Sequence, residues 1–293
     1  MDVQITNLTK TYKGKVRALD GITLSIRGGM VGLLGANGAG KTTLMRILTG
    51  IIPASSGSVV IGGHDLATAA GRRAVTRSLG YLPQHLDVYP DLTGREFLDY
   101  IALLKGIDDK RVRRQQIDSL LERVSLTDVA DRRLGGYSGG MKRRIGIAQA
   151  LLGDPSLIIV DEPTAGLDPE ERMRFRTLLA SLGGDRTVIL STHILDDVSQ
   201  TCPQVAVLTK GRLVFHGSTS SLVEAAAGKT FTITTSGPPP QGDFAVVSAQ
   251  AVTGGTMYRV VTATPPEGAQ PVEPGLEDGY LALMRADRQS VRS

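Results

Sequence analysis

The sequence has a single cysteine, no tryptophan and few aromatic residues of any kind. Cys202 is the one cysteine among 293 residues, and aromatic side chains make up only 4% of the chain. One cysteine cannot form an internal disulfide, which excludes a disulfide-stapled fold and indicates a reducing compartment. By contrast, 41% of the residues are hydrophobic, enough for a sizeable core in a chain of this length.

Long hydrophobic runs are also missing. The longest apolar stretches, such as Leu157–Val160, have the length of a strand, far short of the ~20 residues that a membrane-spanning helix needs. The first residues, Met1–Thr6, do not show a basic segment followed by an apolar stretch, so we expect no secretory signal. The sequence therefore predicts a chain that is soluble by itself.

The charge balance is mild. Thirty-three Lys and Arg residues stand against 29 Asp and Glu residues, for a net charge of +4. Nucleic-acid-binding proteins concentrate basic residues on one face, and we expect no nucleic-acid partner here. The short basic run Lys110–Arg114 is interpreted as a solvated helix face.

Short apolar runs alternate with helical patterns over the first part of the chain. This alternation predicts an α/β fold with a sheet covered by helices, and strands are expected near residues 30–34, 79–82, 157–160, 187–190 and 205–208. Residues 92–152 are mostly helical in pattern and more charged, which indicates an inserted helical subdomain. Composition shifts at Pro238–Gly242, and we expect two domains, 1–217 and a small α+β appendage at 218–293.

A phosphate-binding loop is the strongest motif. The pattern G-x-x-x-x-G-K-[ST], between a predicted strand and a predicted helix, is matched by Gly35, Ala36, Asn37, Gly38, Ala39, Gly40, Lys41 and Thr42. Glycines let successive backbone N–H groups face phosphate oxygens, and the helix N-terminus adds its positive dipole. Lys41 supplies a charge for the β- and γ-phosphates, and the Thr42 hydroxyl is a ligand for Mg²⁺.

A second half of such a site follows an apolar strand. The run Leu157–Val160 ends in Asp161 and Glu162. Beside a phosphate loop, Asp161 is expected to serve the magnesium ion, and Glu162 to polarise the attacking water as a general base.

These motifs, together with Tyr137–Met141, resemble the ATP-binding subunit of ABC transporters. The loop Tyr-Ser-Gly-Gly-Met is similar to the family's LSGGQ signature, and Asp161 follows Ser138 by 23 residues. The resemblance covers about residues 1–217. It implies that Ser138, Gly139 and Gly140, at a helix N-terminus, contact the γ-phosphate bound by a second subunit.

Further residues take their expected roles from this resemblance alone. Tyr12 resembles the aromatic residue that stacks on adenine, and Gln84 resembles the glutamine that touches Mg²⁺ and senses the membrane partner. Ala165–Asp168 resembles the loop that crosses to the second subunit, and His193 the histidine at the γ-phosphate. Taken singly, a tyrosine such as Tyr12 is most often a surface or core aromatic, and a histidine such as His193 is more often structural than a ligand. The implied nucleotide-binding set also includes Thr43, and the implied catalytic set is Glu162, His193 and Lys41.

The signature departs from the family pattern at both ends. Tyr137 stands in place of Leu and Met141 in place of Gln, which affects the packing beside the loop, while the Ser-Gly-Gly core is intact. The basic residues Lys142, Arg143 and Arg144 follow. They are interpreted as a solvated helix face, with added positive potential as the alternative.

The resemblance implies a P-loop NTPase of the ABC type, with a RecA-like core, a β-subdomain and a helical subdomain. It implies an ATPase that uses ATP and Mg²⁺, works as a head-to-tail dimer of two copies and lies on the cytoplasmic face of the membrane against a separate transmembrane permease. The C-terminal segment Pro274–Leu283 is similar to bacterial drug- and lipid-exporting ATPases, which favours export. The alternatives are a soluble ABC ATPase of translation or DNA repair, and an importer ATPase.

Overall fold

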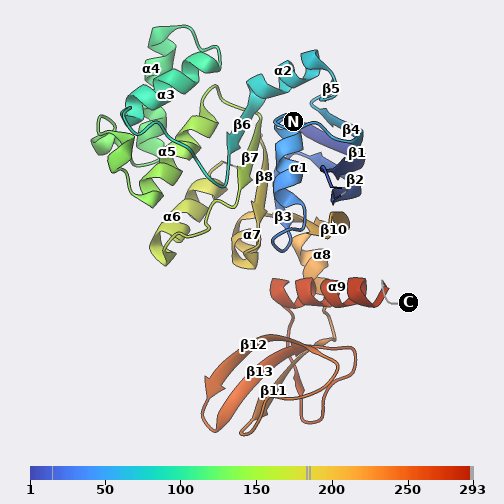
Figure 1. Ribbon diagram of the computed structural model, residues 1–293. Helices are drawn as coiled ribbons and strands as arrows, with labels where there is room; N and C mark the ends of the chain where they lie inside the picture. Colours follow the sequence, from blue (N-terminus) through green and yellow to red (C-terminus); the bar gives the residue numbers. More distant parts are fainter. Residues whose placement is uncertain (15, 183, 185, 291–293) are drawn as a thin grey trace. The chain divides into compact units, whose positions relative to one another are not determined.

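The computed structural model describes residues 1–14, 16–182, 184 and 186–290 (Figure 1). The chain forms two compact units. The first consists of Met1–Cys202 with Ala206–Leu213, and the second of Pro203–Val205 with Val214–Ser293. The units divide within strand β10 (Arg212–Ser218), whereas the sequence places the domain boundary after residue 217.

The first unit begins with an antiparallel sheet in the order β2-β1-β4-β5. Its strands are β1 (Asp2–Thr11), β2 (Arg17–Arg27), β4 (Ser56–Ile61) and β5 (His64–Asp65). Alternate residues of β1 and β2 face the core, so that Val3 and Ile5 are buried between exposed neighbours. This period of two is that of a sheet with one solvated face.

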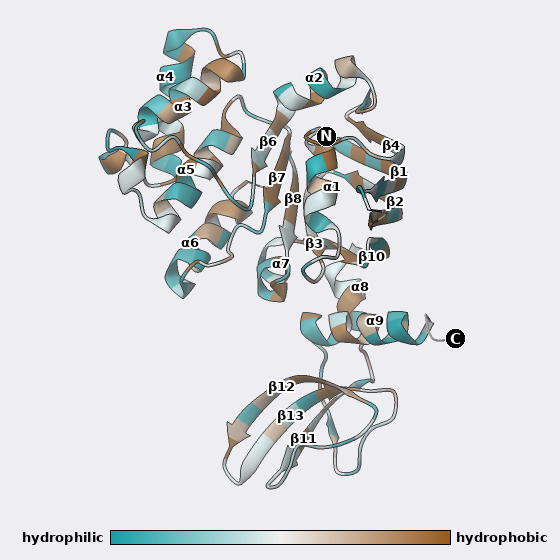
Figure 2. Ribbon diagram, in the orientation of Figure 1, coloured by the Kyte–Doolittle hydropathy of each residue, from teal (hydrophilic) through white to brown (hydrophobic). Residues whose placement is uncertain are grey.

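A mostly buried second sheet carries the candidate site. Its order is β10-β9-β3-β8-β7-β6, formed by β3 (Gly29–Leu34), β6 (Leu79–Leu82), β7 (Leu157–Asp161), β8 (Thr187–Thr192), β9 (Gln204–Thr209) and β10. Strand β8 pairs in parallel with both β3 and β7. Leu34 is opposite Thr192, and Asp161 is opposite Ser191, so the segments after β3, β7 and β8 begin at one edge of the sheet. Figure 2 shows the apolar character of β7 and β8, every residue of which is buried.

Helices α1 (Lys41–Leu48), α2 (Ala69–Ser78), α6 (Pro169–Ala180) and α7 (Leu195–Thr201) connect these strands. Each of α2 and α6 begins with a side chain that caps the helix: Thr68 accepts a hydrogen bond from Gly71 N, and Asp168 accepts one from Glu171 N. Such caps satisfy backbone donors that the first turn leaves without partners.

The helical subdomain contains α3 (Gly94–Leu104), α4 (Lys110–Arg123), η1 (Thr127–Val129), η2 (Leu134–Gly136) and α5 (Gly139–Leu151), drawn in green in Figure 1. The interpretation of Lys110–Arg114 as a solvated face is wrong at Arg113, which is only 7% exposed. Its guanidinium pairs with Asp99 at 2.7 Å and donates to the carbonyl oxygens of Ile107 and Asp108. Arg113 thus joins α4 to α3, because this fourth residue of the run faces inward on the helix.

The second unit is a small α+β fold. It contains α8 (Thr219–Glu224), a sheet in the order β12-β13-β11-β14 and α9 (Leu276–Ser290). The strands are β11 (Thr230–Thr235), β12 (Ala245–Val252), β13 (Gly255–Val261) and β14 (Gln270–Pro271). The Asp278 side chain on α9 is 2% exposed and pairs with Arg259 of β13 at 2.7 Å, which fixes the helix to the sheet.

Among the helices of the described residues, we find none whose length and hydropathy together would let it cross a bilayer.

Candidate nucleotide site

The phosphate-binding loop lies between β3 and α1. Gly38 and Gly40 adopt positive φ angles of 81° and 108°. A Cβ atom at Gly40 would lie 2.7 Å from the backbone oxygen of Ala18, so this position requires glycine both for its conformation and for its space. At Gly35, a Cβ would lie 2.5 Å from the backbone oxygen of Leu208. The close packing holds the loop, with Ala36, Asn37 and Ala39 between these glycines, in one shape at the N-terminus of α1.

Lys41 begins α1 and is 5% exposed. Its Nζ atom donates to the backbone oxygen of Gly35 at 2.6 Å and lies 3.2 Å from Glu162 Oε1. The ammonium is therefore held inside the loop, between the loop's own carbonyl and the first carboxylate beyond β7. A buried lysine in this position supplies a fixed positive charge to an anion bound by the loop.

Glu162 is at the centre of the site. It is 4% exposed and has a φ angle of 48°, in the left-handed region that residues other than glycine rarely adopt. Its backbone N–H donates to Ser191 O at 2.9 Å, and its Oε2 lies 2.8 Å from Nδ1 of His193. Strained backbone of this kind concentrates at functional sites, where the surroundings hold it in place.

Asp161 precedes Glu162 and is fully buried. Within the described residues, neither of its carboxylate oxygens has a hydrogen-bond partner, and the hydroxyl of Ser191 also has none. Burial raises the pKa of Asp161, while the neighbouring Ser191 and Thr42 hydroxyls and the Lys41 charge oppose that shift. A buried carboxylate without a partner is costly, and beside a threonine hydroxyl it suits a hard divalent cation that prefers oxygen ligands.

The signature loop caps α5. Ser138 Oγ accepts a hydrogen bond from Met141 N at 3.2 Å, so its hydroxyl proton remains available to an acceptor. A Cβ at Gly140 would lie 1.8 Å from the Glu171 carboxylate, whereas a Cβ at Gly139 would meet nothing within 4 Å. A larger residue at Gly140 would displace the end of the Glu171 side chain, whereas the space at Gly139 is open.

Tyr137 replaces the family's leucine in a packing position. The side chain is 5% exposed, and its Oη donates to the Val129 carbonyl at 2.8 Å. A Cβ at Gly94 would lie 2.4 Å from this hydroxyl, so the tyrosine fits because α3 begins with glycine. The substitution changes the packing behind the signature loop, in which Ser138 and Gly139 are exposed and Gly140 is buried.

The remaining residues expected from the sequence lie around this centre or at its margins. Tyr12 is 40% exposed, and its hydroxyl lies 3.4 Å from Thr43 Oγ1 in the first turn of α1. His193 is exposed beside Glu162, and Gln84 is exposed in the segment after β6. Asp168 caps α6, as described above, after the turn Pro163–Gly166.

The interpretation of Lys142, Arg143 and Arg144 as a solvated helix face is wrong, because all three are half-buried. Arg144 donates to the carbonyl oxygens of Val124 and Ser125. Arg143 donates to those of Gln84, Glu162 and Pro163. Sequence reasoning missed Arg143 as a neighbour of the site, and its place on the same helix as the signature loop was the available signal.

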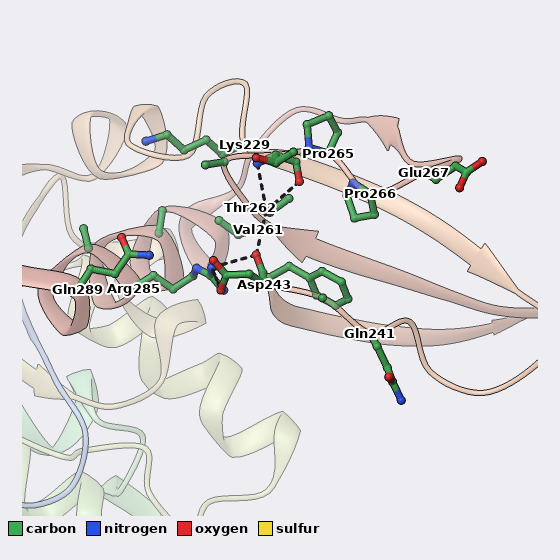
Figure 3. A pocket seen from close by; sticks show the side chains of 16 residues that line it. Lys229, Gln241, Asp243, Val261, Thr262, Pro265, Pro266, Glu267, Arg285 and Gln289 are labelled. Carbon is green, nitrogen blue, oxygen red and sulfur yellow. Dashed lines mark hydrogen bonds and ion pairs between the residues drawn. The ribbon is translucent and has the colours of Figure 1, made fainter. Parts of the chain in front are cut away.

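A separate cavity of about 480 Å³ lies in the second unit (Figure 3). Arg285 and Asp243 form an ion pair at 2.6 Å at its wall, and Thr262 donates to the Asp243 backbone oxygen. Lys229, also at the wall, donates to Ala225 O. These three charged side chains, Arg285, Asp243 and Lys229, thus make contacts within the second unit, unlike the unpartnered Asp161 at the phosphate loop.

Comparisons with known proteins agree with this geometry. Residues 19–165 match the family model described as ABC transporter. The chain is 40% identical over 250 residues to the "Phospholipid-transporting ATPase ABCA7" of Homo sapiens, covering 84% of this chain and 12% of that protein. It is 36% identical over 228 residues to the "Daunorubicin resistance ATP-binding protein DrrA3" of Streptomyces coeruleorubidus, covering 77% of this chain and 71% of that protein. The chain thus spans about an eighth of the long curated relatives that it matches.

A solved structure also matches the first unit's architecture. The "ATP-binding cassette MJ0796", in a dimeric post-hydrolysis state bound to ADP and Pi, aligns with a TM-score of 0.68 and 27% identity over 74% of this chain and 98% of that chain. The P-loop fold of the ABC type that the sequence predicts is confirmed. On these grounds the chain belongs to the ABC transporter family, as an ATP-binding cassette.

Proposed function

We propose that this chain hydrolyses ATP to drive export through a separate membrane-embedded subunit. One observation supports this most strongly. A buried lysine, a buried unpartnered carboxylate and a strained glutamate in contact with a histidine converge beside a phosphate-binding loop. These are the groups that phosphoryl transfer to water requires, since that reaction depends on positioning and charge neutralisation.

Each group has a distinct role in the proposed reaction. The loop N–H groups and Lys41 neutralise the phosphate charge, and Tyr12 stacks on the adenine ring. Glu162 accepts a proton from the attacking water, and His193 holds the Glu162 carboxylate at 2.8 Å in the required orientation. Lys41 lies 3.2 Å from Glu162 Oε1, so a bound phosphate competes with the Glu162 carboxylate for the same ammonium and frees that carboxylate to face the attacking water.

The same site fits a magnesium ion. Thr42, Asp161 and Gln84 are the residues that would hold it. A bound Mg²⁺ neutralises charge on the β- and γ-phosphates. In this chain the buried Asp161 carboxylate supplies the fixed negative charge. Gln84 is exposed after β6, and its side-chain oxygen would be a further ligand.

We further propose that two copies close head to tail on two ATP molecules. The open space at Gly139 and the available proton of Ser138 support this. A helix N-terminus with these features accommodates an anion, and here that anion is the γ-phosphate held by the partner copy. The loop ending in Asp168 faces the partner in the same arrangement.

An exposed apolar patch fits the membrane subunit. It consists of Tyr89, Tyr100, Leu103 and Leu104, which are 53%, 41%, 45% and 68% exposed. The Tyr89 and Tyr100 rings meet edge to face at 5.6 Å, and the other two residues follow Tyr100 on one face of α3. Tyr89 follows Gln84 by five residues in the segment after β6. The patch that the membrane subunit would cover is therefore linked through the backbone to the nucleotide site. The protein accordingly acts on the cytoplasmic face of the membrane as a peripheral subunit.

Export is favoured over the alternatives by the relatives. A drug-resistance ATP-binding protein and a phospholipid-transporting ATPase are both similar to this chain over more than three quarters of its length. An importer ATPase, or a soluble ATPase of translation or repair, is the rival function. Co-purification with a membrane protein, and the direction of transport in inverted vesicles, separate these alternatives.

The proposed chemistry is tested by the magnesium dependence of ATP hydrolysis. Asp161→Asn removes the unpartnered charge without changing the side chain's size, and we expect the Mg²⁺ concentration for half-maximal turnover to rise by ~10-fold or more. Asp118→Asn is the matched control, because Asp118 is half exposed and pairs with Arg95 on the helical subdomain. Hydrolysis by Asp161→Asn with an unchanged magnesium requirement would contradict the assignment.

A further inference from the structure

Arg143 connects two segments of the nucleotide site to the signature helix. It lies on α5, five residues after Ser138. Its Nη1 donates to Gln84 O at 2.5 Å, and its Nε donates to Pro163 O at 2.7 Å. Its Nη2 donates to Glu162 O. One guanidinium thus holds the backbone after β6 and the backbone after β7.

The contact with Glu162 bears on the residue under strain. Glu162 has a φ angle of 48°, and Arg143 donates to the carbonyl oxygens of Glu162 and of the next residue, Pro163. Fixing two successive carbonyls fixes the backbone that carries the Glu162 side chain. An arginine suits this task, because its planar group presents several donors in a rigid fork, whereas a lysine is a point charge.

The environment of Arg143 shows that it is committed to these contacts. Burial lowers its pKa, and the Asp161 and Glu162 carboxylates oppose that shift. Its neighbour Arg144 is equally half-buried on the same helix but donates to Val124 and Ser125, within the helical subdomain. The two arginines therefore carry the same charge on the same helix but bind different carbonyls.

We propose that Arg143 is a positioning residue that couples the two nucleotide sites of the dimer through helix α5. This rests on the proposed function, in which Ser138 contacts the partner's γ-phosphate while Gln84 and Glu162 serve the subunit's own ATP. Phosphate contact at the N-terminus of α5 shifts the helix. Arg143 transmits that shift to the backbone of Gln84 and Glu162. Each nucleotide site therefore hydrolyses ATP only when the other site also holds ATP.

The first test compares Arg143→Gln with Arg144→Gln in the full-length protein. We expect Arg143→Gln to keep the affinity for a non-hydrolysable ATP analogue within about twofold and to lower kcat by ~10- to 100-fold, because misplacement of a base affects turnover more than binding. Arg143→Lys keeps the charge but satisfies fewer carbonyls, and should recover only part of kcat. Arg144→Gln should retain kcat within about twofold. Equal losses in both Gln variants would overturn the proposal, since they would show a general effect on the helical subdomain.

The second test is a double-mutant cycle with Ser138→Ala. When two residues act independently, their activation free-energy changes add, so the fold-losses in kcat multiply. When two residues act through one helix, the double variant loses less than this product. We expect Ser138→Ala with Arg143→Gln, or with Arg143→Lys if the Gln variant does not fold, to lose clearly less than the product of the single losses. Ser138→Ala with Arg144→Gln should be multiplicative. Multiplicative losses for the Arg143 pair overturn the coupling while leaving the ATPase function intact, whereas a wild-type protein without ATPase activity would overturn the proposed function itself.

Discussion

The Lys41 ammonium and the Glu162 carboxylate form a buried ion pair at 3.2 Å, with both side chains 5% exposed. The pair links the phosphate loop after β3 to the acidic end of β7. Truncating one partner of a buried ion pair leaves the other charge without compensation, which costs several kcal/mol. Lys41 and Glu162 thus stabilise the folded protein as a pair, and both also take part in the proposed reaction.

Lys41→Ala should weaken nucleotide binding itself. The substitution removes the charge that faces the phosphates and also leaves the Glu162 carboxylate facing the site. We expect the Kd for ATP to rise by ~100-fold or more, in keeping with the loss of a charged hydrogen bond and ion pair in a buried site. Isothermal titration with a non-hydrolysable analogue measures this, with the exposed Lys110→Ala as the control. Unchanged affinity would remove Lys41 from phosphate binding.

The signature loop should act on the partner's nucleotide. The Cβ atom that Gly139→Ala adds has no atom of its own subunit within 4 Å. The folded variant should therefore bind ATP as the wild type does, while closure of the dimer is impaired. Ser138→Arg should abolish turnover more completely, because its side chain fills the space that the γ-phosphate needs. ATP affinity of the monomer and steady-state turnover are the two readouts. Loss of monomer binding in Gly139→Ala would show that the loop serves its own subunit's nucleotide.

Lys105 predicts a pH dependence of stability. It lies beyond α3 and donates to Leu152 O at 2.8 Å, and burial lowers its pKa to about 8. An unfolded lysine titrates near 10.4, so between about pH 8 and 10.4 the unfolded chain binds more protons than the folded one. The contribution of Lys105 to the free energy of unfolding therefore increases by about 2 kcal/mol as pH rises through that window.

Urea unfolding of wild type and Lys105→Gln at several pH values between 7 and 10 isolates this effect. The difference in unfolding free energy, wild type minus variant, should increase with pH, and the exposed Lys110→Gln should give a flat difference. A difference that falls as pH rises would show that Lys105 is not desolvated.

Much of the fold follows from local sequence patterns. The apolar runs that become β3, β7 and β8 are visible because strands buried on both faces are apolar throughout. The phosphate loop can be recognised in the sequence because its glycines stand at fixed positions, where positive φ angles and close contacts exclude larger residues. The helical subdomain and the two-part organisation follow from composition, and the division between the compact units falls within β10, where the sequence itself shows no break.

Side-chain direction was beyond sequence reasoning. Arg113 and Arg143 stand in basic runs that are typical of solvated surfaces, yet each turns inward onto backbone carbonyls. The carbonyls that attract them belong to segments distant in the chain or to turns whose geometry exists only in the folded state. The left-handed conformation of Glu162 was likewise invisible, because no glycine marks it.

Glu162→Gln separates closure of the proposed composite site, which two copies form on ATP, from its reopening, which requires hydrolysis. The measurement is sedimentation velocity of the purified variant with ATP and Mg²⁺, with turnover assayed on the same sample and the exposed Glu170→Gln as control. We expect a stable ATP-dependent dimer and turnover lowered by ~10²- to 10⁴-fold through loss of the general base. A variant that remains monomeric with ATP and turns over at a near-normal rate would contradict the proposed composite site.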